Sequence, residues 1–143
     1  MRHRIKKIKF KQGKDANTMM LRKLTVNFIR HGKITTTLHR VKVLKSQIER
    51  LVEKMKVESE ANKNQLLSAV GDTRLLRRMF KDIGQPLKDK VGGYVRIVRL
   101  GSRQSDSAEI ASLQWAYPVV FEAKKKPAEK IESDKPVKQV EKK

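Results

Sequence analysis

Residues 38–55 read LHRVKVLKSQIERLVEKM and carry the strongest hydrophobic periodicity of the chain. The apolar residues recur at spacings of three and four, which is typical of one face of an α-helix. They are Leu38, Val41, Leu44, Ile48, Leu51, Val52 and Met55. The other face alternates in charge, and Lys45 and Glu49 have the spacing of an exposed ion pair. We therefore predict an amphipathic helix of about 27 Å that supplies much of the core.

Shorter helices are predicted on both sides of this segment. Upstream, apolar residues at helical spacing occupy residues 20–29, with Asp15, Asn17 or Thr18 as the N-cap and Gly32 as the end. Downstream, a helix with apolar residues between 61 and 70 ends at Gly71, and a second one begins at Asp72 and ends at Gly84. The faces of this last helix that are left for solvent are basic and carry Arg74, Arg77, Arg78 and Lys81.

The chain then changes to β-branched and aromatic residues. Residues 94–100 and 108–115 are predicted to form two strands joined by a polar turn, and so an antiparallel hairpin. Ile34 and its threonine neighbours indicate a third, short strand, after which Thr36 or Thr37 caps the long helix. We predict an α+β fold in two layers, with about four helices packed on a small, mainly antiparallel sheet.

Charge is the strongest functional signal. The 143 residues contain 35 Lys and Arg but only 15 Asp and Glu, which gives a formal net charge of +20. So much like charge in a small protein repels itself, and a polyanion such as nucleic acid relieves the repulsion. No stretch approaches the roughly 20 apolar residues of a membrane span, and the N-terminus lacks the apolar core of a secretory signal. We therefore expect a cytoplasmic protein.

The charge is concentrated at the N-terminus. Residues 1–14 contain seven Lys or Arg and no acid, and we predict an extended arm that orders on RNA. A single α/β domain is expected over residues 15–121. Residues 122–143 are rich in Lys, Glu and Pro, and we predict a disordered tail there.

Catalysis is not expected. The chain has no cysteine, its three histidines are scattered, and the sparse acids mostly lie beside Lys or Arg. Gly92-Gly93 is not followed by the residues of a phosphate-binding loop. We predict no catalytic residue, no metal and no cofactor. Tyr94, Trp115 and Tyr117 are interpreted as core or core-edge residues, which argues against stacking on single strands and favours phosphate and shape recognition of folded RNA.

Three motifs carry a family resemblance. They are Met1-Arg2-His3-Arg4, then Arg30-His31 followed by Lys33-Ile34-Thr35-Thr36-Thr37-Leu38, and Gly92-Gly93-Tyr94-Val95-Arg96-Ile97. Their order and spacing over residues 1–115 resemble the bacterial large-subunit ribosomal protein family that is numbered seventeen. The chain departs from the family's pattern at Ala16-Asn17, where a His-Arg pair is usual, and at Ser105, where glycine is favoured.

The resemblance implies contact with large-subunit ribosomal RNA, a place on the outer surface near the exit of the peptide tunnel, and neighbouring ribosomal proteins as partners. Charge clustering and the resemblance together give a set of candidate RNA-binding residues in the arm, at the end of the first helix and along the hairpin. They are Arg2, His3, Arg4, Lys6, Lys7, Lys9, Lys11, Arg22, Arg30, His31, Lys33, Thr36, Thr37, Arg96, Arg99 and Arg103.

Other functions remain open at this point. An architectural DNA-binding protein would explain the charge equally well, and it would bind duplex DNA as tightly as ribosomal RNA. A small RNA-processing enzyme would lose activity, but not binding, when an acid such as Asp106 is changed. A membrane-surface protein would need a helix with a wide, unburied apolar face, and the long helix has too many acids for that.

Overall fold

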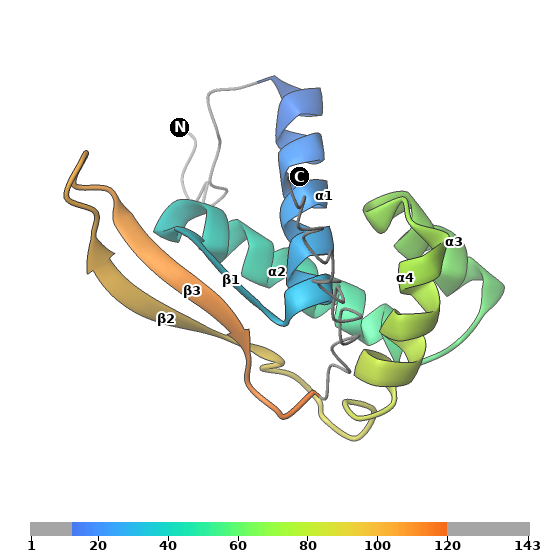
Figure 1. Cartoon of the computed structure of the whole chain (residues 1–143). Helices are drawn as coiled ribbons and strands as arrows, with labels where there is room; N and C mark the ends of the chain where they lie inside the picture. Colours follow the sequence, from blue (N-terminus) through green and yellow to red (C-terminus); the bar gives the residue numbers. More distant parts are fainter. Residues whose placement is uncertain (1–12, 120–143) are drawn as a thin grey trace, which may run out of the picture.

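The computed structural model describes residues 13–119 as an α+β fold, which confirms the predicted fold class (Figure 1). The helices are α1 (Lys14–His31), α2 (Leu38–Met55), α3 (Glu60–Val70), α4 (Thr73–Arg78) and the π-helix η1 (Met79–Gly84). The strands are β1 (Lys33–Thr37), β2 (Val95–Ser102) and β3 (Glu109–Trp115). The predicted arm over residues 1–14 and the predicted tail over residues 122–143 lie almost entirely outside the described residues, so the domain boundaries stay predictions.

The three strands form one antiparallel sheet in the order β1-β3-β2. The third strand predicted at Ile34 is confirmed, because Ile34 of β1 is paired with Leu113 of β3. Helix α2 packs on β2 and β3 and lies behind the sheet in Figure 1. The opposite face of the sheet is turned towards the viewer in Figure 1. Val98 of β2 alternates with the buried Val95 and the half-buried Ile97 and is 36% exposed.

Helix α2 is the centre of the core. All seven apolar residues predicted from its periodicity are buried, and the helix bounds agree with the prediction. Lys45 and Glu49 also pair as predicted, with 3.8 Å between Nζ and Oε1. Tyr94 and Trp115 are only 1% and 9% exposed, which confirms their interpretation as core residues.

The helix ends follow the predicted caps only in part. Gly32 and Gly71 have φ angles of 71° and 75°, and Asp72 accepts a hydrogen bond from the Arg74 amide, so these three predictions are confirmed. The N-cap predicted among Asp15, Asn17 and Thr18 is wrong, because α1 begins at Lys14 after Gly13 and no side chain caps it. The Thr18 hydroxyl donates instead to the Lys14 carbonyl within the first turn. Thr37 occupies the N-cap of α2 but makes no capping hydrogen bond.

Gly84 is the last residue of η1, where the helix was predicted to end. Unlike Gly32 and Gly71, it does not have a positive φ angle, so it is not a left-handed cap. A Cβ atom at Gly84 would lie 2.1 Å from the carbonyl oxygen of Met55. Glycine is required here because the end of η1 packs directly on the backbone of α2.

A small polar network fixes the entry to β2. The buried Tyr94 hydroxyl donates to the Glu53 carboxylate of α2, and Lys56 donates to Tyr94 and to the Lys90 carbonyl. The hydrogen bond from Tyr94 lowers the pKa of Glu53, because it stabilises the charged carboxylate. The loop before β2 is thereby tied to the C-terminal half of α2.

Candidate RNA-binding surfaces

The predicted RNA-binding residues fall into several groups in the structure. Seven of them lie in residues 1–12, outside the described residues: Arg2, His3, Arg4, Lys6, Lys7, Lys9 and Lys11. The other nine lie on α1, β1, β2 and the β2–β3 turn, and the structure shows which of them are available to a ligand.

Lys33 and Arg96 are brought together on the sheet. Both are exposed and both are paired with Gln114, Lys33 from β1 and Arg96 from β2. Directly opposed residues share a face of the sheet, so the two backbones are separated by two strand spacings, about 10 Å. Their side chains leave the face remote from α2, because strand alternation puts Arg96 opposite to the buried Val95.

Arg99 lies on the other face of β2. It is paired with the buried Ala111 and lies three positions after Arg96, an odd offset, so strand alternation puts the two arginines on opposite sides. Arg99 is exposed and lines a hollow of about 230 Å³ together with Leu38, the first residue of α2. Hence Arg96 and Arg99 flank the edge of the sheet from two sides and do not form one flat patch. We refer to Lys33, Arg96 and Arg99 as the sheet cations.

The Arg103 side chain is already bound to another side chain of the protein. Its guanidinium donates to both carboxylate oxygens of Asp106, at 2.8 Å from Nε and 2.5 Å from Nη2. The Asp106 carboxylate also accepts from the Ala108 amide, so it organises the turn between β2 and β3. The Arg103 hydrogen bonds are the main reason that the pKa of Asp106 falls from 3.8 to about 2.

Replacement of Arg103 by alanine is expected to raise the pKa of Asp106 from about 2 towards 3.8. In the native protein the folded-state pKa lies below the unfolded value, so the pair stabilises the turn above pH 3.8 and loses this effect as the pH falls through about 2. An NMR titration of the Asp106 carboxyl measures the shift. Arg99→Ala is the matched control, since Arg99 does not contact Asp106, and equal titration curves in Arg103→Ala and the native protein would contradict the assignment.

Arg22 and Arg30 also make contacts inside the described domain. Arg22 donates to the Ser68 carbonyl at 2.6 Å, and its guanidinium packs against Gly71 at the end of α3. A cation at a helix C-terminus interacts favourably with the helix dipole, so this contact ties α1 to α3. Arg30 pairs with Asp72 at 3.1 Å, although its side chain is still 49% exposed. The RNA-binding role of both residues stays a prediction.

The remaining predicted residues cluster where α1 passes into β1. His31, the last residue of α1, is exposed, whereas Thr36 and Thr37 are half-buried. Thr36 is paired with Ala111 on the side of the sheet covered by α2, and Thr37 precedes α2. Of these three side chains, His31 is the most accessible to a ligand.

A group of cations on α4 and η1 was missing from the predicted site. Arg74, Arg77 and Lys81 are all exposed, and none of them forms an ion pair with another residue in the range 13–119. Their separations of three and four residues put them on one side of the helix. That spacing is visible in the sequence and could have identified them, but the basic faces were noted without being included among the candidate RNA-binding residues. We refer to these three residues as the α4 cations.

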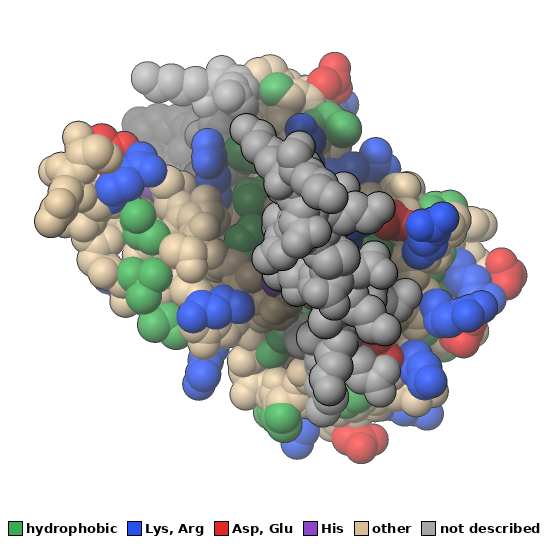
Figure 2. Space-filling model, viewed as in Figure 1, with side chains coloured by type: hydrophobic (Ala, Val, Ile, Leu, Met, Phe, Trp, Pro, Cys, Tyr) green, Lys and Arg blue, Asp and Glu red, His purple; other side chains and the backbone are tan. Residues whose placement is uncertain are grey.

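Other chemistry finds little support in the described part of the chain. Residues 13–119 contain no group of three or more His, Asp or Glu side chains able to hold a metal ion. None of the helices in this range is both long and apolar enough to span a membrane. The surface view shows Lys and Arg side chains at several separate places (Figure 2). The arrangement suits electrostatic binding of a polyanion over a broad surface.

Two comparisons with known proteins agree with this arrangement. The profile described as "Ribosomal protein L17" matches residues 20–116, which is more than half of the chain. The chain is 34% identical over 124 residues to the "Large ribosomal subunit protein bL17" of Fervidobacterium nodosum, covering 80% of this chain and 98% of that protein. The matched region contains α2, the whole sheet and the α4 cations. The chain therefore belongs to the ribosomal protein L17 family.

Proposed function

We propose that this protein is a structural, non-catalytic constituent of the large ribosomal subunit that binds and stabilises folded ribosomal RNA through phosphate contacts. The main support for the proposal is the exposure of the sheet cations and their lack of pairing with carboxylates within residues 13–119. Lys33, Arg96 and Arg99 are exposed and have no carboxylate partner among residues 13–119, on a chain with a net charge of +20. Cations left unpaired by the protein are available to phosphates, and release of the phosphates' counterions drives binding.

The choice of folded RNA over single strands follows from the aromatic residues. Tyr94 and Trp115 are buried, and Phe28 lies within the core against Trp115. A single-strand binder needs exposed rings on which bases stack. The arginines available on the surface suit planar contacts with phosphate. Membership of a ribosomal protein family supports ribosomal RNA as the polyanion.

The proposed place in the cell is the bacterial cytoplasm, with the protein on the outer surface of the large subunit near the exit of the peptide tunnel. This location rests on the family resemblance of residues 1–115. Neighbouring ribosomal proteins are the proposed protein partners. Val98 and Leu100 of the edge strand β2 are 36% and 58% exposed, and apolar side chains on an open sheet edge suit a protein neighbour.

The proposal is tested by sedimentation of a cell lysate on sucrose gradients of rising salt, with the native protein followed by immunoblot. We expect it to travel with the large subunit at moderate salt and to leave only at high salt. A variant with alanine at the three sheet cations should leave at lower salt, because each lost phosphate contact removes about 0.7–0.9 from the slope of log K against log salt. A control variant removes three exposed charges elsewhere: Lys23→Ala, Lys42→Ala and Arg50→Ala.

Two results would contradict the proposal. If the native protein stays at the top of the gradient, it is not a constituent of the subunit. If it travels with the chromosome and binds duplex DNA as tightly as large-subunit RNA, the architectural DNA-binding function replaces the ribosomal one. Electron cryomicroscopy of the subunit fraction checks the proposed location. Density for the domain at a place away from the tunnel exit would refute the proposed location.

A further inference from the structure

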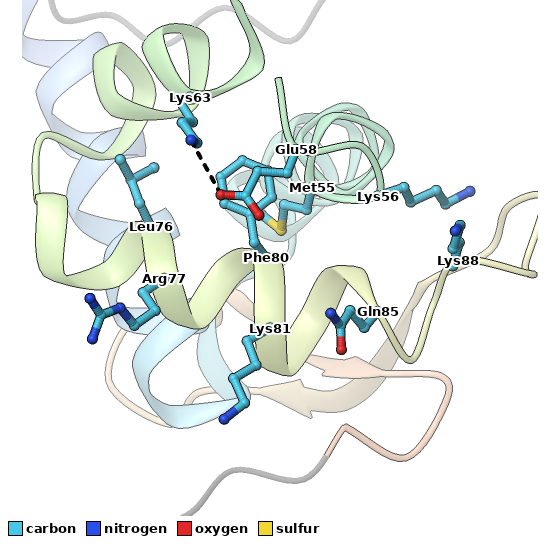
Figure 3. Close-up of a pocket in the computed structure, with 10 residues that line it drawn as sticks. All are labelled: Met55, Lys56, Glu58, Lys63, Leu76, Arg77, Phe80, Lys81, Gln85 and Lys88. Atoms are coloured by element: carbon cyan, nitrogen blue, oxygen red, sulfur yellow. Dashed lines mark ion pairs between the residues drawn. The ribbon is translucent and has the colours of Figure 1, made fainter. Parts of the chain in front are cut away.

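The α4 cations form a second basic surface whose position is set by the helix itself. Arg78 and Met79 both have right-handed helical angles, so α4 continues into η1 without a break. Figure 3 shows Arg77 and Lys81 on the outer side of this helix, while Phe80 turns towards Met55 in the interior. From Arg74 to Lys81 the cations extend over about 10 Å of helix.

Positive charge predominates around this surface. A groove of about 560 Å³ beside it is lined by five Lys or Arg side chains and by one acid, Glu58. Glu58 is already paired with Lys63, at 3.3 Å from Oε1 to Nζ. On the helix itself, Asp82 lies 3.6 Å from Arg78, which is not one of the α4 cations. Lys56 and Lys63 are also paired, with Glu53 at 3.1 Å and with Glu60 at 3.0 Å. The positive charge that the groove presents to a ligand therefore comes from its other three cations, Arg77, Lys81 and Lys88.

The groove has little open apolar surface, and this property indicates the chemical class of its ligand. Its apolar floor is already closed, because Met55 and Phe80 are only 1% and 9% exposed. A bound acidic peptide would need pockets for its apolar side chains, and this floor provides none. Exposed arginines on a helical stripe, with no apolar anchor, suit phosphate groups of a nucleic acid backbone.

Among the sheet cations, Arg99 is held far from the α4 cations. Lys33 lies nearer to them, because Arg30, three positions before Lys33, pairs with Asp72, two positions before Arg74. Helix α2 has 18 residues and is therefore about 27 Å long. Arg99 lies beside Leu38 at one end of α2, and Gly84 of η1 lies against Met55 at the other. Lys33 and Arg96 leave the sheet face remote from α2. In Figure 1, β2 and α4 stand on opposite sides of the molecule, with α1 and α2 between them.

We infer that the α4 cations bind phosphates of a second RNA segment, and that the protein bridges two segments of folded RNA across α2. The inference rests on the proposed function, since it assumes that the sheet cations already hold RNA. It adds a partner segment and three residues that the sequence-based site did not contain. Helix α2 fixes the distance between the segment held at Arg99 and the segment held at the α4 cations.

The test is hydroxyl-radical footprinting of large-subunit ribosomal RNA with the full chain at moderate salt. The native protein should protect two separate groups of nucleotides. Alanine at all three α4 cations should abolish one group and retain the other, and the sheet variant should give the reverse pattern. In parallel binding measurements, the α4 variant should lower the slope of log K against log salt by about 2–3. Lys23→Ala, Lys42→Ala, Arg50→Ala is again the control with the same net charge.

The outcomes separate this inference from the proposed function. If the α4 variant keeps every protection while the sheet variant loses some, the bridge is refuted and the proposed function stands. If the α4 variant and the control weaken all protections equally, only net charge matters and the bridge is also refuted. If a polyglutamate peptide binds the α4 cations as tightly as RNA does and displaces the RNA, the surface is a protein-binding one. If the native protein protects nothing, the proposed function itself fails. Circular dichroism of each variant shows that it is folded.

Discussion

Replacement of Phe28 by alanine is expected to lower the free energy of unfolding by about 3–5 kcal/mol. Phe28 is completely buried, and the centre of its ring lies 4.8 Å from the centre of the Trp115 ring. The substitution removes a large apolar side chain at the point where α1 packs on β3, and it also removes the favourable contact between two aromatic rings. A loss of this size is a large part of the stability of a small domain.

Urea unfolding of the full chain measures the effect. Trp115 is the only tryptophan of the protein, so its fluorescence follows the unfolding of the affected region. Circular dichroism provides a second signal that does not depend on the neighbour of the altered residue. Met19→Ala is the matched control, because Met19 lies on the same helix but is 47% exposed. A loss below 1 kcal/mol for Phe28→Ala, as is usual for surface sites, would show that α1 is not anchored through this contact.

Replacement of Gly84 by alanine should destabilise the fold by roughly 3 kcal/mol, although it adds only one methyl group. The new Cβ would lie 2.1 Å from the carbonyl oxygen of Met55 and 2.8 Å from its carbonyl carbon. Both are backbone atoms in the last turn of α2, so no side chain can rotate away. Either η1 moves from α2 or the end of α2 is deformed, and both disturb the buried residues around Ile83.

The matched substitution is Gly92→Ala, where no atom lies within 4 Å of the added Cβ. We expect the urea midpoint to fall strongly for Gly84→Ala and to change little for Gly92→Ala. If the two variants unfold at the same denaturant concentration, the close approach of η1 to α2 is not present in solution. Because Gly84 lies near the α4 cations, RNA footprints of any folded Gly84→Ala protein should also change on that side.

The elements of this fold were predictable where local signals agree with one another. The periodicity of α2, the glycines after α1 and α3, and the strand-like residues of the hairpin each pointed to the observed structure. Short-range signals failed at two positions. The N-cap of α1 was expected among polar residues, yet the helix starts at Lys14 without a side-chain cap. The role of Gly84 depends on Met55, which is 29 positions away, and no pattern within the helix reveals it.

The candidate surface was less predictable than the fold, because charge in a sequence does not show which cations are already paired. In the sequence, Arg103 and Arg96 both look like exposed cations of the hairpin. Only the structure shows that the Arg103 guanidinium donates hydrogen bonds to Asp106. Arg22 likewise looks like a surface cation of α1, although it binds the Ser68 carbonyl. The α4 cations show the opposite error, since the basic faces of that helix were noted but were not included among the candidate residues. Pairing depends on the distance between elements, which composition and spacing do not contain.

The irregularity in β2 has a consequence for the free protein. Between Arg99 and Gly101 the register with β3 shifts, so Leu100 forms a bulge in the exposed edge strand. A straight apolar edge can pair with the same edge of another molecule and begin an aggregate, whereas a bulge and nearby charges prevent continuous pairing. Arg96 and Arg99 supply those charges on the two sides of the strand. We therefore expect free copies of the chain to resist edge-to-edge polymerisation through β2.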